Sequence, residues 1–198
     1  MKNMITALAS VSMAVSALTT AALAQELAPP EPPASAPENP APPLPPACEG
    51  APYTDFDFWL GEWDVYDEAG TTLQGHNSIT SAEDGCLIIE RWKGVGGSTG
   101  QSYNFYDPTT EEWRQLWVAR GAVIDYTGGL NEAGQMVLEG TIAYRTSGLV
   151  AGFRGTWTER PDGAVIQFFE QENGETGEWS EWFTGLYIPS GTTQVPAD

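Results

Sequence analysis

The chain has 198 residues, 27 acidic side chains against 8 Lys and Arg, and a formal net charge of −19. This length suits one domain with appended segments rather than two domains. The acidity argues against nucleic acid and anionic membrane surfaces as partners, because both repel a negatively charged protein.

Residues 1–24 have the pattern of a secretory signal peptide. Lys2 supplies a positive start, a small apolar run follows, and Ala22-Leu23-Ala24 forms a cleavage pattern before Gln25. The Ser and Thr residues in this run favour a cleaved signal over a stable membrane span. We therefore expect an exported protein, periplasmic or extracellular, with no membrane span in its mature form.

Residues 25–47 are too rich in proline for helix or sheet and are typical of a disordered, semi-rigid spacer. A proline-rich ligand for another protein is the alternative. The sequence places one folded domain at residues 48–190 and a flexible tail at 191–198.

Two cysteines are present, Cys48 and Cys86. In an exported protein such a pair predicts a disulfide. Lipidation of Cys48 is the alternative, but this residue lies far from the apolar part of the signal.

Four aromatic residues surround one glycine at the start of the domain, in the stretch FDFWLGEW. Residues 53–61 are compatible with a short helix, and Gly61 permits a sharp turn into the first strand. We expect this cluster to plug one end of a β-barrel with the following residues: Phe56, Phe58, Trp59, Gly61 and Trp63.

The rest of the domain alternates between apolar and polar residues and is cut by turn residues, which predicts strands. About ten segments are expected to contain them: 62–70, 72–81, 86–94, 101–112, 113–121, 122–130, 135–144, 152–163, 164–178 and 179–188. Short turns imply antiparallel neighbours, and closure removes exposed edges. The predicted fold is an all-β, roughly ten-stranded up-and-down barrel. A two-sheet sandwich is the alternative, but it requires longer crossovers.

Ordered motifs across residues 53–188 resemble a family of exported bacterial proteins of unknown function with a lipocalin-like (calycin) barrel. These motifs are FDFWLGEWDV, GCLIIERWKG, GQSYNFYDPTTEEWRQLWV, GTWTERPDGAVIQFFE and WFTGLY. Gly61-Glu62-Trp63 is also similar to the Gly-x-Trp lipocalin signature. The resemblance implies the barrel fold and no assigned catalytic residues.

Several kinds of chemistry lack their usual residues. His76 is the only histidine, so one chain cannot build a metal site from a histidine cluster. The glycine-rich stretch 94–100 lacks the lysine of a phosphate-binding loop. We expect no cofactor, no metal and no identifiable catalytic residue.

Polar residues interrupt the apolar rows of several predicted strands. A cavity lined by aromatic side chains with a few placed polar groups would need such a pattern. The candidate ligand-binding residues are Glu90, Trp92, Ser102, Asn104, Gln115, Trp117 and Gln167. In the alternative, these residues face solvent or pack in the core, and Glu90 pairs with Arg91, Arg114 or Arg154 across strands.

Binding of a small hydrophobic or amphipathic ligand in the barrel is the function that this pattern favours. One alternative is a hydrolase or isomerase that uses a buried acid such as Glu90. Another is an envelope interaction protein whose barrel is filled by its own side chains.

Overall fold

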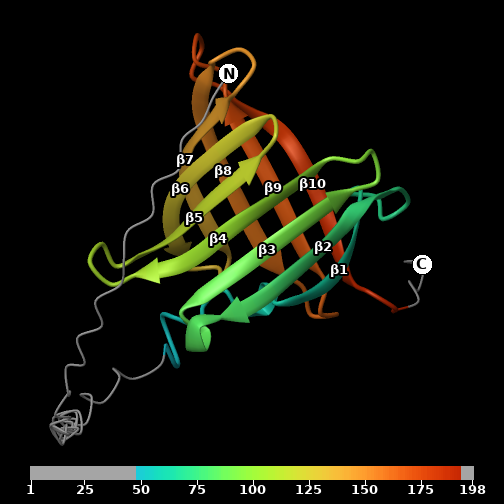
Figure 1. The fold of residues 1–198 in the computed structure, drawn as a ribbon, viewed down its shortest axis with the longest axis vertical. Coiled ribbons are helices and arrows are strands. Elements are labelled where there is room, and N and C mark those ends of the chain that lie inside the picture. Colours follow the sequence, from blue (N-terminus) through green and yellow to red (C-terminus); the bar gives the residue numbers. More distant parts are fainter. Residues whose placement is uncertain (1–47, 193–198) are drawn as a thin grey trace, which may run out of the picture. The chain divides into compact units, whose positions relative to one another are not determined.

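The structure, a computed structural model, describes residues 48–192. Within this range ten strands close into one antiparallel up-and-down barrel (Figure 1). The predicted signal peptide and linker, and residues 193–198 of the predicted tail, lie outside the described residues.

The predicted all-β barrel with about ten strands is confirmed. The strands are β1 Gly61–Tyr66, β2 Leu73–Ala82, β3 Leu87–Gly94, β4 Thr99–Asp107, β5 Glu112–Ala119, β6 Ala122–Leu130, β7 Met136–Tyr144, β8 Val150–Glu159, β9 Val165–Glu172 and β10 Trp179–Pro189. Each strand pairs with its neighbour in the sequence, and β1 pairs with β10 from Trp63 opposite Pro189 to Tyr66 opposite Leu186. This last pairing closes the sheet and excludes the sandwich.

The segment before β1 contains a single 3-10 turn, η1, at Asp57–Trp59. Phe56 and Trp59 are fully buried and stack with ring centroids 5.0 Å apart. The ring of Phe56 also lies 5.2 Å from that of Trp157 in β8. Aromatic side chains therefore fill the barrel interior where β1 begins.

Two indole hydrogen bonds hold this segment against the strands. Trp63 Nε1 donates to the carbonyl of Trp59 at 2.9 Å, and Trp113 Nε1 donates to that of Pro52 at 3.0 Å. Gly61 joins the turn to β1 with a φ of +147°, a value that L side chains rarely adopt. The glycine thus permits the abrupt change of direction between η1 and β1.

The predicted disulfide is present between Cys48 and Cys86. Cys86 follows the second 3-10 turn, η2 at Glu83–Gly85, and directly precedes β3. The bond thereby ties the start of the described chain to the turn between β2 and β3. Among residues 48–192, no helix is long and apolar enough to cross a membrane.

Loss of the disulfide should destabilise the barrel. The bond joins residues 38 positions apart, so the double variant C48A/C86A should lose about 4 kcal/mol of unfolding free energy through the greater entropy of its unfolded chain. Denaturant unfolding measures this loss. A reducing agent should weaken the wild type similarly and leave the double variant unchanged. Equal unfolding midpoints for the variant and the oxidised wild type would contradict the expectation.

Candidate functional site

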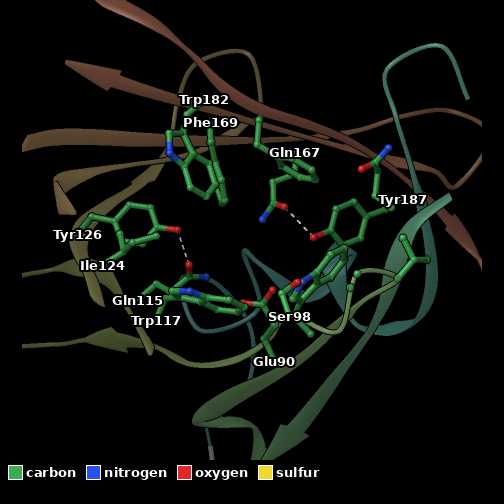
Figure 2. A pocket seen from close by; sticks show the side chains of 16 residues that line it. Glu90, Ser98, Gln115, Trp117, Ile124, Tyr126, Gln167, Phe169, Trp182 and Tyr187 are labelled. Carbon is green, nitrogen blue, oxygen red and sulfur yellow. Dashed lines mark hydrogen bonds between the residues drawn. The ribbon is translucent and has the colours of Figure 1, made fainter. Parts of the chain in front are cut away.

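The barrel interior away from η1 contains a cavity of about 370 Å³ (Figure 2). Residues from β2, β3, β5, β6, β9 and β10 and from the β3–β4 hairpin line it: Gln74, Glu90, Trp92, Gly94, Val95, Gly96, Ser98, Gln115, Trp117, Ile124, Tyr126, Gln167, Phe169, Trp182, Phe183 and Tyr187. Val95 and Trp182 are well exposed and lie at the cavity mouth. The interior is thus filled at one end and hollow at the other.

The candidate ligand-binding residues all have side chains that are buried or half-buried within the barrel. Those that line the cavity are Glu90, Trp92, Gln115, Trp117 and Gln167. Ser102 and Asn104 do not line it, although both are completely buried. Their side chains connect Glu90 to Gln115 by hydrogen bonds.

Glu90 is the centre of a buried hydrogen-bond network. Its Oε1 accepts from Asn77 Nδ2 of β2 at 2.7 Å, and its Oε2 accepts from Ser102 Oγ of β4 at 2.6 Å. Ser102 lies opposite Glu90 in the β3–β4 ladder, and Asn77 lies opposite Trp92, two residues from Glu90 along β3. Neighbouring strands therefore supply both partners of the carboxyl group.

One branch of the network runs from Ser102 to β6. Asn104 Nδ2 donates to Ser102 Oγ at 2.9 Å and to the carbonyl of Ile88 at 3.1 Å. Gln115 Nε2 donates to Asn104 Oδ1, and the hydroxyl of Tyr126 donates to Gln115 Oε1. This branch links Glu90 to Tyr126 across β4 and β5.

The other branch runs from Asn77 to β9. Asn77 Nδ2 also donates to the hydroxyl of Tyr187 in β10 at 3.1 Å, and that hydroxyl donates to Gln167 Oε1 at 2.7 Å. Figure 2 shows the last bond and the amide nitrogen of Gln167 turned toward the cavity. The complete network joins seven strands and borders the hollow part of the barrel.

Glu90 has no positive partner among the described residues. Arg114 pairs with Asp125 at 2.8 Å, and Arg154 pairs with Glu170 at 2.8 Å. Arg91 is exposed, and its Nη1 lies 3.4 Å from Thr80 Oγ1. The predicted alternative of a cross-strand ion pair for Glu90 is therefore wrong, because these arginines face outward.

Burial sets the charge state of this group. The Glu90 residue is only 4 % exposed, and loss of hydration raises its pKa to about 7, although the hydrogen bonds from Asn77 and Ser102 act in the opposite direction. Burial also raises the pKa of Tyr126 and of Tyr187 well above the usual value, and the negative charge of Glu90 adds to both shifts. Both phenols are therefore hydrogen-bonding groups at neutral pH.

Inward-facing glycines make room for the indole rings of the cavity wall. The ring of Trp92 occupies the space that a side chain at Gly75 would need, and the ring of Trp117 does the same at Gly100. Each ring therefore packs against a neighbouring strand, and both indoles line the cavity.

The predicted ligand-binding residues do not include several members of the site, among them Asn77, Tyr126, Trp182 and Tyr187. The alternation of inward and outward residues along a strand could have predicted Asn77 and Tyr126. Each lies two positions from a buried isoleucine, Ile79 or Ile124, and therefore on the same face of its strand. The same alternation could not predict the position of Trp182. A register shift between Glu181 and Phe183 breaks the alternation of β10 at this residue.

His76 lies outside the cavity. Its Nδ1 is 2.7 Å from Asp64 Oδ1, and its side chain is 57 % exposed. Within residues 48–192, no group of three or more His, Cys, Asp or Glu residues has the geometry to hold a metal ion.

A scan against protein-family models found no match to this chain, and a search of curated proteins found no similar sequence. The resemblance to exported lipocalin-like proteins accordingly stays a prediction.

Stability should depend on pH through Glu90. Its pKa is about 7 in the folded protein and near 4.5 in an unstructured chain, so the folded state holds this proton more tightly. The contribution is fully present below pH 4.5 and falls by on the order of 3 kcal/mol as pH rises to 7. Denaturant unfolding of the wild type and of Glu90→Gln between pH 4.5 and 8 measures the effect.

The difference in stability between these two proteins should change across that pH range in favour of Glu90→Gln at higher pH. Glu112→Gln, which removes an exposed carboxyl group at the start of β5, should follow the wild type. Parallel curves for the wild type and Glu90→Gln would show that Glu90 is not desolvated.

Proposed function

We propose that this protein binds one small, partly hydrophobic ligand in the barrel cavity. The observation that carries the proposal is a hollow of about 370 Å³ whose lining includes seven aromatic side chains and a few polar groups. Cavities of roughly 300–1,000 Å³ with this character are typical of small-molecule sites.

The lining favours a ligand with a flat or bulky apolar part. Trp92, Trp117, Phe169, Trp182 and Phe183 provide the apolar contact surface. Rings of a ligand would gain from stacked or edge-on contacts with these side chains. Glu90, Gln115 and Gln167 would orient the polar part of the ligand, since all three border the same hollow.

We also propose that the aromatic cluster before β1 acts as the plug of the barrel. The burial of Phe56 and Trp59 and their contacts with Trp113 and Trp157 support this role. The closed end would give the cavity a fixed floor, so that the ligand enters from the side of Val95 and Trp182. This arrangement fits the proposed lipocalin-like relationship.

Export is part of the same proposal. Disulfides persist in oxidising compartments such as the periplasm or the extracellular medium, and the Cys48–Cys86 bond supports such a location. The signal-like residues 1–24 point the same way.

A buried acid with a pKa of about 7 is the one observation that favours an enzyme. Such a group could act as a general base in an isomerase or hydrolase. Binding is the better-supported function, because the Glu90 carboxyl, the Tyr126 and Tyr187 hydroxyls and the Gln115 amide already hydrogen-bond one another through the network. The cavity disfavours the remaining alternative, a barrel filled by its own side chains.

A neutral aromatic probe should bind in the cavity. We expect 2-(1-naphthyl)ethanol to bind the wild type at one saturable site and to raise its melting temperature, because the folded state alone offers the cavity. Ser98→Trp should weaken binding at least about tenfold, because Ser98 lies at the cavity mouth and an indole there would obstruct it. Isothermal titration calorimetry measures both affinities.

Ser147→Trp is the matched control. Ser147 is exposed in the β7–β8 loop and does not line the cavity, so this variant should bind like the wild type. Equal weakening by both substitutions, or no saturable binding to the wild type, would contradict the proposed function.

A further inference from the structure

The cavity contains one carboxyl group and no opposite charge. Glu90 is the only Asp, Glu, Lys, Arg or His among the described residues that line it. A buried carboxylate without a cation is costly, because its lost hydration is only partly replaced. A positive group in the cavity would offset this cost.

Hydrogen-bond capacity near Glu90 points in the same direction. Each carboxylate oxygen accepts one hydrogen bond from the protein, although each has room for about two. Beside it, Oδ1 of the buried Asn77 has no donor among the described residues. Acceptors without donors thus gather around this carboxyl group, and a ligand that donates hydrogen bonds would complement them.

The walls next to Glu90 suit a cation. Trp92 lies two residues along the same strand on the same face, and Trp117 lies opposite Ser102, which itself lies opposite Glu90. Both indoles line the same cavity as Glu90. The face of an indole attracts a cation within about 6 Å.

We propose that the natural ligand is an amine, bound as its ammonium ion with Glu90 as the counter-ion and Trp92 and Trp117 beside it. This inference rests on the proposed function, ligand binding in the cavity. The net charge of −19 would favour the approach of such a ligand and disfavour carboxylates of the same shape.

Binding of an ammonium ion should be coupled to ionisation of Glu90. The groups that face this carboxyl are Asn77 of β2, Ser102 of β4, Tyr126 of β6 and Tyr187 of β10. None of them changes charge near pH 7. Below that pH Glu90 must release its proton before it can act as a counter-ion, so the affinity for an amine should fall by up to about tenfold per pH unit.

The test compares three probes that share one ring system: 2-(1-naphthyl)ethylamine, 2-(1-naphthyl)ethanol and 3-(1-naphthyl)propionate. Calorimetric titration of the full chain at pH 5, 6, 7 and 8 gives their affinities. We expect the amine to bind at least about tenfold more tightly than the alcohol at pH 8 and the carboxylate to bind most weakly. The preference for the amine should shrink toward pH 5, while the affinity for the alcohol stays nearly constant.

Glu90→Gln should abolish both the preference for the amine and its pH dependence while the alcohol still binds, which shows that the variant is folded. Glu112→Gln removes an exposed carboxyl group and should behave as the wild type. Equal binding of amine and alcohol, or a preference that survives in Glu90→Gln, would overturn this inference and leave the proposed function intact. Failure of all three probes to bind would overturn both.

Discussion

Pairing of β1 with β10 is the constraint on which the rest of the structure depends. It removes the two edges of the sheet and forces alternate residues of every strand into a common interior. Side chains from η1, β5 and β8 fill this interior at one end, where Phe56, Trp59, Trp113 and Trp157 meet. The other end stays hollow, so closure creates both the core and the cavity.

Between the aromatic core and the cavity lies a polar network centred on Glu90. Apolar side chains would pack there at lower cost, because each buried polar group must find a partner. The network satisfies most of its members but supplies no cation to Glu90. Glu90 therefore has hydrogen-bond donors but no positive charge beside it. This is the physical basis for assigning a positively charged ligand to the site.

The period of two along strands made much of the fold and the site predictable. It placed Glu90 with Trp92 and Gln115 with Trp117 on shared faces, and short turns predicted antiparallel order. It could not say which face is inward, because that depends on how the sheet closes. Partners such as Asn77 and Tyr187 lie far apart in the sequence and meet only through the β1–β10 closure. The bulge at Trp182 broke the pattern locally, so its position at the cavity mouth carried no sequence signal.

The most direct test of this account is the pKa of Glu90 itself. Carbon-13 NMR of the side-chain carboxyl carbons, with Glu90→Gln to assign the resonance, follows its titration in the folded protein. We expect a midpoint of about 7 that falls when 2-(1-naphthyl)ethylamine is bound. A midpoint near 4.5, unchanged by the amine, would show that Glu90 is hydrated and is not the counter-ion of a bound amine.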